Sequence, residues 1–265
     1  MPSPAFHLTF LERHSIRKRK KGLLEPSGVA LASDGDLLWV VCDETRALFG
    51  LSLEGRLERS IRIPEKGLEG ITLAPGGQSA LVVEEKDNEV LEIELRSGKE
   101  LRRQRLEAME GFEAIAEHFR SDGRNKGLEG ISINAATGSI VVMKERDPGL
   151  LIEISSDLSR ILGVQALDHH SGFLVAGEPS HAVDFSDLCY DISRDQFWII
   201  SDQARRLFLY DWRSHRVVHS APLAYGHKGH YREVSKPEGI AIDPERRRLY
   251  VVSDDEARLY VFDVR

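Results

Sequence analysis

Short apolar runs rich in Val, Ile and Leu alternate along most of the chain with turns that contain Gly, Asp or Pro. Runs of this kind predict antiparallel β-strands joined by tight turns. Five units open in the same way, with an apolar segment that carries Ser or Glu near its start, followed by Gly or, in one unit, Asp. These opening segments are residues 26–31, 68–73, 128–133, 185–190 and 237–242.

Two further predicted strands follow in each unit. The second strands end in an acidic residue and cover 38–43, 80–85, 140–145, 198–202 and 250–254. The third strands cover 47–51, 90–94, 151–154, 206–210 and 258–262. A fourth strand is visible in the first units, for example over 56–63. Four-stranded units repeated around an axis are propeller blades, so we predict an all-β, five-bladed β-propeller that forms one domain over 1–265.

The last unit reaches Arg265 after only three strands. The segment Phe6–Leu11 alternates imperfectly between apolar and polar residues and can supply the missing fourth strand. We therefore expect the N- and C-terminal strands to share one blade. Closing the ring in this way removes free sheet edges, which otherwise favour aggregation.

Three connections between units are longer than the rest: 106–126, 168–184 and 223–236. Each joins the outer strand of one blade to the inner strand of the next, so all three should lie on one face, called the top face below. We expect a short helix over 107–119, with Glu113 as a helical residue rather than the start of another blade. Unequal insertions on one face often mark a functional surface, although they can also be loops without a function.

The Ser or Glu of each opening segment stands at the start of the strand that lines the channel, so these side chains should meet around the axis. Three carboxylates in a narrow channel repel one another and lose hydration, so they need a cation or raised pKa values. Calcium (Ca²⁺) suits such a set, because it accepts six to eight oxygen ligands of mixed type. The alternative is that these acids accept hydrogen bonds from backbone amides of the next blade. The predicted metal ligands are Ser27, Glu69, Glu129, Ser186 and Glu238.

The acids that end the second strands should return to the same top face, where they either form an outer ring or cap turns. They are Asp43, Glu85, Glu145, Asp202 and Asp254. Asp43, Asp202 and Asp254 are the candidate catalytic residues, because each could position a water molecule for attack. Cations predicted on the same face are candidates for binding an anionic substrate. They are Arg46, Lys144, Arg205, Lys236 and also Lys228.

Several histidines fall in the top-face connections, where they either form a transition-metal or acid–base site or are solvated loop residues. They are His169, His170, His181, His227 and His230. The sequence contains neither a Gly-x-Ser-x-Gly nucleophile elbow nor a Walker-type phosphate loop. Nucleophilic serine catalysis is therefore not predicted.

The formal net charge of -7 argues against general nucleic-acid binding, which needs a cationic surface. The run Arg17–Lys21 is a local exception, either a solvated connection or a docking patch for phosphates or an acidic membrane surface. Cys42 and Cys189 lack metal-type spacing. No apolar stretch is long enough to span a bilayer, and no secretion signal is visible. We expect a cytoplasmic monomer, or a periplasmic or envelope-associated protein if a leader was removed.

Four short motifs resemble the SdiA-regulated (YjiK-like) family of bacterial proteins. They are the segments NKGLEGIS at 125–132, KERDP at 144–148, SDQARRL at 201–207 and KPEGI at 236–240. The resemblance covers about residues 22–265. It implies a small β-propeller with calcium in its channel and no well-defined molecular activity. Many relatives carry an N-terminal membrane or export segment, which this sequence does not show.

A more distant similarity connects the chain with the calcium-activated nucleotidases (apyrases), which are also five-bladed. In that family the central calcium is ringed by Ser, Glu, Glu, Ser and Glu in chain order, the same order as in the predicted ring here. The similarity implies metal ligation more than nucleotidase activity, because no segment matches the aromatic loops that hold the nucleotide. Asp187 departs from the Gly of the other units, so the backbone of the fourth blade should differ there.

Two classes of function remain open from the sequence. In the first, calcium pins the blades together and the top face binds a protein, a peptide or a small anionic ligand. In the second, the chain is a calcium-dependent hydrolase of phosphate esters, as in nucleotidases, or of carboxylic esters, with the metal polarising the substrate oxygen. Fold alone does not choose between them.

Overall fold

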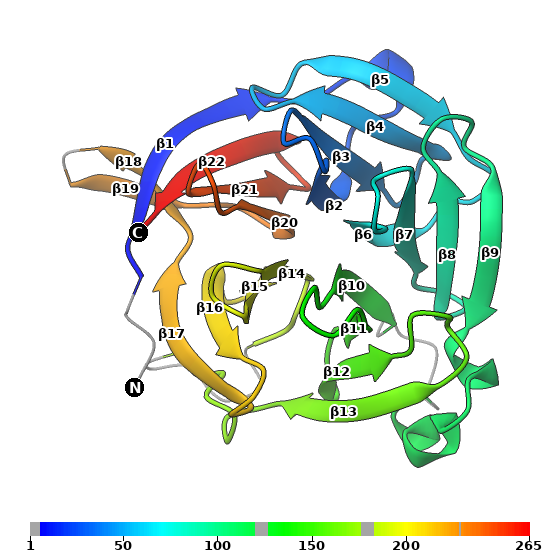
Figure 1. Cartoon of the computed structure of the whole chain (residues 1–265). Helices are drawn as coiled ribbons and strands as arrows, with labels where there is room; N and C mark the ends of the chain where they lie inside the picture. Colours follow the sequence, from blue (N-terminus) through cyan, green and yellow to red (C-terminus); the bar gives the residue numbers. More distant parts are fainter. Residues whose placement is uncertain (1–5, 120–126, 176–182, 228) are drawn as a thin grey trace.

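Five four-stranded antiparallel sheets stand around a common axis, as the repeat predicts (Figure 1). The computed structural model describes residues 6–119, 127–175, 183–227 and 229–265. Blade 1 contains β2 (Pro26–Leu31), β3 (Leu37–Cys42), β4 (Ala47–Ser52) and β5 (Leu57–Arg62). Blade 2 contains β6 (Leu68–Leu73), β7 (Ser79–Glu84), β8 (Glu89–Glu94) and β9 (Glu100–Arg105).

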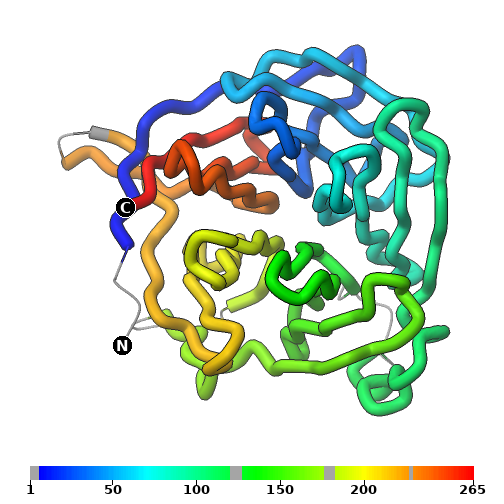
Figure 2. The backbone as a smooth tube through the Cα atoms, in the orientation of Figure 1, coloured from blue at the N-terminus to red at the C-terminus, as the bar shows by residue number. Residues whose placement is uncertain are grey.

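The remaining blades follow the same order from the axis outward. Blade 3 contains β10 (Leu128–Ile133), β11 (Ile140–Lys144), β12 (Gly149–Ile154) and β13 (Ile161–Leu167). Blade 4 contains β14 (Asp187–Asp191), β15 (Gln196–Ser201), β16 (Arg206–Asp211) and β17 (Arg216–Pro222). Blade 5 contains β20 (Pro237–Asp243), β21 (Arg248–Ser253), β22 (Arg258–Val264) and β1 (Leu8–Ser15). The tube in Figure 2 follows the chain once around the ring from the blue end to the red end.

The two ends of the chain close the ring within blade 5, as expected. β1 pairs antiparallel with β22, and a bulge between Phe10 and Glu12 lets the pairing continue to Ser15, beyond the predicted end of the strand. The backbone amide of His7 donates to the carbonyl of Arg265 at 2.7 Å. This blade therefore has its outer strand from the start of the chain and its inner three strands from the end.

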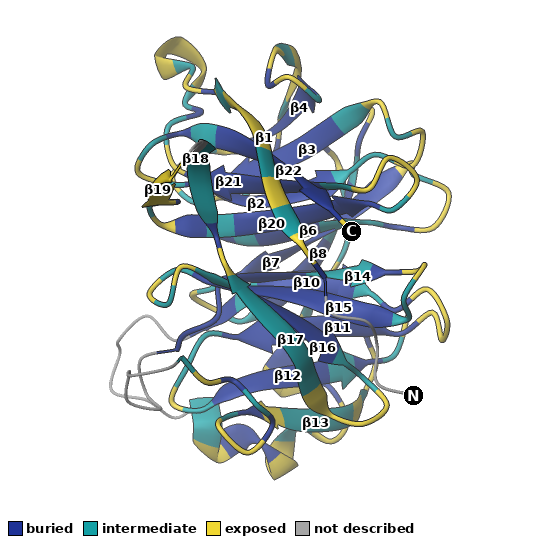
Figure 3. Cartoon of the chain, turned by 90° about the vertical axis from the view of Figure 1, so that its left-hand side faces the viewer, coloured by how far each residue is buried: buried dark blue, intermediate teal, exposed yellow. Residues whose placement is uncertain are grey.

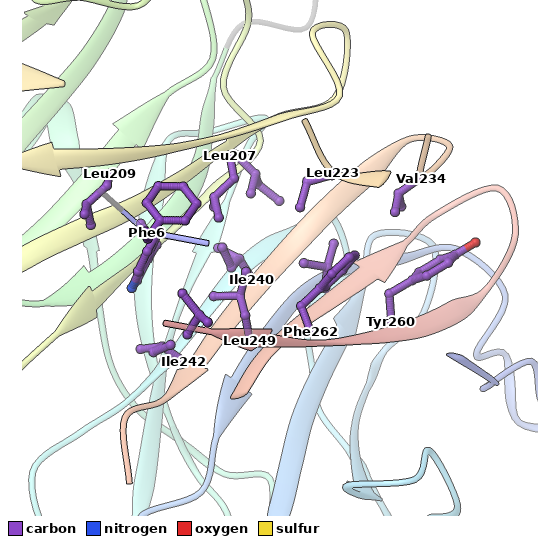
Figure 4. Close-up of a cluster of buried hydrophobic side chains, with 14 residues drawn as sticks. Phe6, Leu207, Leu209, Leu223, Val234, Ile240, Ile242, Leu249, Tyr260 and Phe262 are labelled. Carbon is purple, nitrogen blue, oxygen red and sulfur yellow. The ribbon is translucent and has the colours of Figure 1, made fainter. Parts of the chain in front are cut away.

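The hydrophobic core consists of wedges between neighbouring blades. One wedge joins blades 4 and 5, where Leu207 and Leu209 pack toward Ile240 and Phe262 (Figure 4). Phe6 enters this wedge with its ring edge-on to Trp198 at 4.7 Å between centroids. Four equivalent clusters fill the other interfaces. The inner strands are consequently buried, whereas the outer strands alternate between covered and exposed residues (Figure 3).

The long connections carry little regular structure. The first holds short 3₁₀ helices, η2 (Leu106–Ala108), η3 (Phe112–Ala114) and η4 (Ala116–Phe119), so the expected helix is present in a tighter and interrupted form. Glu113 lies in η3 and begins no blade, as predicted. The third connection holds the hairpin of β18 (Ala224–His227) and β19 (His230–Glu233). Among the described residues, none of the helices combines the length and the apolar character needed to cross a bilayer.

Candidate functional site

The inner strands carry a β-bulge at the predicted ring position in four of the five blades. Ser27 lies between Pro26 and Gly28, where the register with β3 shifts, and Glu129 lies at the same kind of shift in β10. Glu69 and Glu238 occupy the corresponding bulges of β6 and β20. A bulge inserts an extra residue and re-aims its side chain. In blade 4, Ser186 instead directly precedes β14.

The glycines after these residues pack against one another around the axis. A Cβ atom on Gly70 would lie 2.6 Å from the carbonyl oxygen of Glu129 and 2.9 Å from the Cα of Gly130. A Cβ on Gly239 would lie 2.9 Å from the carbonyl carbon of Gly28. The blades therefore approach so closely that four of the five positions accept only hydrogen in place of a side chain.

Asp187 takes the fifth place in this circle, and the backbone of blade 4 accommodates it differently, as its sequence suggested. Its carboxylate accepts hydrogen bonds from the amides of Leu188 at 2.8 Å and of Ile240, in blade 5, at 2.9 Å. The residue is 1% exposed, and burial raises the pKa of its carboxyl well above the ordinary value. Asp187 thus links blades 4 and 5 where the other blades touch through glycine.

Above this circle, a cavity of about 200 Å³ opens at the top face. All five predicted ring residues line it. Among the described residues, seven further acidic or basic side chains line it. They are Asp43, Glu145, Arg146, Asp184, Asp202, Lys236 and Asp254.

The three ring glutamates share a strongly unfavourable electrostatic environment. Burial, and then the negative charges of Asp43 and Glu85, raise the pKa of Glu69 to about 8. The pKa of Glu129 is raised well above its ordinary value, first by burial and then by the charge of Glu69. Burial followed by the charge of Asp202 does the same for Glu238. Without a cation at the axis, these carboxyls therefore favour the protonated form.

Of the predicted outer acids, Asp43, Glu145, Asp202 and Asp254 line the cavity, whereas Glu85 does not. Asp43 accepts a hydrogen bond from the amide of Glu44 at 2.7 Å, as a turn-capping residue would. By contrast, one oxygen atom, Oδ1, of Asp202 and of Asp254 is fully buried without a hydrogen-bond partner. Two carboxylates at the cavity wall thus have unused acceptor capacity.

Asp184 belongs to this site although it was not predicted from the sequence. Its Oδ1 accepts hydrogen bonds from the hydroxyl of Ser201 at 2.8 Å and from the amide of Gln203 at 3.1 Å. Burial, and then a hydrogen bond with Asp184, raise the pKa of Asp202 to about 8. Asp184 lies two residues before Ser186, as Glu25 does before Ser27, so the repeat carried a signal for it. Glu25 is exposed and does not line the cavity, so only Asp184 joins the site.

The predicted substrate-binding cations separate into two groups. Lys236 lines the cavity, where its Nζ forms an ion pair with Asp254 and lies 3.6 Å from Glu238 Oε1. Arg46 and Arg205 do not line it: Arg46 is exposed, and Arg205 pairs with Glu233 at 2.9 Å. Their role in holding a substrate stays a prediction.

Lys144 also lies away from the cavity. Its side chain is 1% exposed, and its Nζ donates to the carbonyls of Arg146 and Pro148, the latter at 3.4 Å. Lys144 precedes Glu145 on the chain, and neighbouring strand residues point to opposite faces. Arg146 lines the cavity in its place, with Nε 3.1 Å from Glu145 Oε1.

The top-face histidines form no metal centre among the residues that can be described. The rings of His169 and His170 contact each other at 3.8 Å between centroids, and both side chains are exposed. His230 is exposed in the β18–β19 hairpin. His181 and Lys228 lie outside the described residues. Over the same ranges, no three His, Cys, Asp or Glu side chains stand in an arrangement that could hold a metal ion as it is.

Comparison with known proteins gives a family and a fold. The family model described as SdiA-regulated matches residues 9–263. Glutaminyl cyclase of Myxococcus xanthus is similar in structure, with a TM-score of 0.62 and 14% identity over 97% of this chain and 96% of that one. The β-propeller domain of Cps50 (Swd1) from Myceliophteria thermophila gives a TM-score of 0.56 and 12% identity over 97% and 99%. At such identities, the likeness shows the propeller fold alone.

Proposed function

This chain belongs to the SdiA-regulated family of proteins, and we propose that it is a calcium-binding β-propeller. Glu69, Glu129 and Glu238 would hold one ion on the channel axis, with Ser27 and Ser186 completing the ring. The ion would join the blades and support a binding surface on the top face. The observation that carries this proposal is the meeting of three glutamates from three blades in one cavity.

The donor set fits calcium better than other common metals. The cavity offers carboxylate and hydroxyl oxygens, and no described His or Cys lines it. Calcium prefers hard oxygen ligands in flexible geometry, whereas zinc and copper favour nitrogen or sulfur. The unpartnered Oδ1 atoms of Asp202 and Asp254 add acceptor capacity beside the ring.

The side chains have to rotate toward the axis to bind an ion, because they are not grouped as ligands as they stand. A bound cation would favour their ionised form and offset the repulsion between the carboxylates, so it would favour their closer approach. Their backbones cannot retreat, since the glycines that follow are packed against the next blade. Binding therefore needs rotamer changes within a fixed ring.

The partner of the top face is best sought among molecules with basic groups. The described lining of the cavity carries eight acidic and only two basic side chains. Both basic side chains, Lys236 and Arg146, already pair with acids of the same cavity. One divalent ion leaves an excess of negative charge, so a peptide or protein that presents Lys or Arg suits this face better than an anionic ligand.

Thermal unfolding with calcium or with a chelator tests the metal site. Calcium at about 100 times its Kd should stabilise the protein by about 2.7 kcal/mol, and this should raise Tm by roughly 5–10 °C. Glu129→Gln should lose most of this shift, because it removes a ligand charge at the axis. The matched control is Glu44→Gln, which removes an exposed charge outside the cavity and should keep the shift. If Glu69→Gln, Glu129→Gln and Glu238→Gln each keep the full calcium-induced rise in Tm of the unchanged protein, the ring is not the calcium site.

A calcium-dependent ester hydrolase is the second candidate, favoured by Asp202. Its carboxyl combines a pKa of about 8 with a buried, unpartnered oxygen at the cavity wall. Such a group can accept or donate a proton near neutral pH. Turnover of nucleoside triphosphates or aryl esters that disappears in Asp202→Asn, while calcium binding persists, would establish this activity. Absence of turnover across such a screen would favour the binding module over the hydrolase.

A further inference from the structure

A second cavity, here called the funnel, occupies the other end of the channel. Its volume is about 560 Å³, and it is lined by the inner strands beyond their glycines and by the turns that follow these strands. Ile192, at its rim, is 65% exposed, so an apolar side chain stands at the entrance. The funnel therefore opens on the face opposite the acidic cavity.

Along each inner strand, one residue lies between the part that lines the acidic cavity and the part that lines the funnel. These residues, here called the glycine circle, are Gly28, Gly70, Gly130 and Gly239, with Asp187 in the fifth place. The ring residues line only the upper cavity, and the residues after the glycines, such as Val29 and Ile71, line only the funnel. Between them, a Cβ atom on Gly70 or Gly130 would meet the backbone of the next blade within 3.0 Å. The funnel and the acidic cavity are therefore two separate pockets that have no lining residue in common.

Short side chains keep the centre of the funnel open. The second position after the glycine, or after Asp187, is small in every blade. These residues are Ala30, Thr72, Ser132, Cys189 and Ala241. The residues that precede them, such as Ile71 and Ile240, are larger and belong to the buried wedges between blades. The pocket is therefore built into the repeat.

The lining combines an apolar wall with a few hydrogen-bonding groups. None of the described residues that line the funnel carries a charge. The inner strands stand at the axial end of their sheets, so one edge of each backbone has no neighbouring strand. Ser132 Oγ accepts the amide of Tyr190 at 3.0 Å, which shows how such an edge is satisfied. Asp187 in the same way accepts the edge amide of Ile240 at 2.9 Å. An edge group that has no such partner needs water or a ligand.

We propose that the funnel binds a small, uncharged and largely apolar molecule that carries a hydrogen-bonding group. Its volume lies within the range of about 300–1,000 Å³ that is usual for small-molecule sites. A charged ligand would lose hydration without gaining an opposite charge from the wall. The site is independent of the proposed calcium ion, because the glycine circle lies between them.

A pair of fluorescent dyes tests both the site and its preference for uncharged ligands. N-phenyl-1-naphthylamine is uncharged, and 8-anilino-1-naphthalenesulfonate is its sulfonated relative. We expect saturable binding of the uncharged dye at one site per chain, with or without calcium. The sulfonate should bind about tenfold more weakly or worse, because the wall offers no cation and the protein carries a net charge of -7.

Substitutions locate the bound dye. Thr72→Lys places a charge in the partly exposed middle of the funnel and should weaken binding of the uncharged dye by about tenfold or more. Ala135→Trp, at the rim, should also weaken it and serves if Thr72→Lys fails to fold. The control is Ala136→Trp, which alters an exposed neighbour in the same turn that does not line the funnel. Absence of saturable binding, equal binding of both dyes, or unchanged binding in folded Thr72→Lys and Ala135→Trp would each overturn the proposal.

Discussion

The two ends of the channel are made by the same five strands, yet they have opposite chemistry. The upper cavity collects acidic side chains whose pKa values are raised, such as Glu69 and Asp202. The funnel below is uncharged along its described lining. The boundary between them is the single residue that follows each ring position, which is glycine in four blades and Asp187 in blade 4.

This difference shows how a short repeat can specify two sites at once. The bulge before each glycine re-aims one side chain to the top cavity, and the residues after the glycine return to the regular alternation of a strand. Close contact between glycines fixes the distance between blades. Acidic side chains line the cavity on one side of this contact, and uncharged residues line the funnel on the other.

A substitution that disrupts the glycine circle should have the largest effect on stability. Gly70→Ala places a methyl group against the backbone of blade 3, where neither neighbour is a flexible side chain. We expect a loss of about 3 kcal/mol or more in the free energy of unfolding, measured by urea denaturation.

Gly163→Ala is the matched control, because its new methyl group would have only the Glu153 carboxylate within 4 Å, at 3.7 Å. It should change stability by less than about 0.5 kcal/mol. Similar losses in both variants would mean that the glycine circle is not tightly packed.

The pH dependence of stability should sharpen the contrast between the two cavities. The pKa of Glu69 is about 8 in the folded chain, and those of Glu129 and Glu238 are also raised, so the folded state holds more protons than the unfolded state above the ordinary glutamate pKa. With EDTA present, the free energy of unfolding should therefore fall by about 1 kcal/mol or more as the pH rises from about 5 to 8.

Calcium should reverse this trend, because its ligands must be ionised and its binding strengthens as pH rises. The measurement is urea denaturation across this pH range, with EDTA and with calcium. Dye binding in the funnel should stay constant over the range, since none of its described lining side chains is charged. If the free energy of unfolding measured with EDTA rises from pH 5 to 8, the proposed electrostatics of the ring glutamates is wrong.

The repeat explains why the fold and the ring could be predicted. Each unit restates the same strand pattern, so Glu69, Glu129 and Glu238 fall into equivalent places without any knowledge of distances. The prediction that these positions share one cavity is confirmed by its lining. Their role as calcium ligands stays a prediction.

Other features depended on local geometry that the repeat does not encode. Lys144 ends an apolar strand, where a charged residue is expected at the surface. Its position in the pleat directs the side chain into the protein interior instead. Arg146 is the cation that reaches the cavity. Asp184 reaches the cavity from the end of the connection before blade 4, whereas Glu25, at the same spacing before Ser27, is exposed. The funnel could not be predicted, because its size depends on how closely the glycines of neighbouring blades approach.

A crystal structure of the protein soaked in calcium, with anomalous differences measured, tests the central claim most directly. We expect a single strong peak in the upper cavity, about 2.3–2.6 Å from carboxylate oxygens of Glu69, Glu129 and Glu238. A cavity without a peak at millimolar calcium, or peaks confined to surface carboxylates, would contradict it.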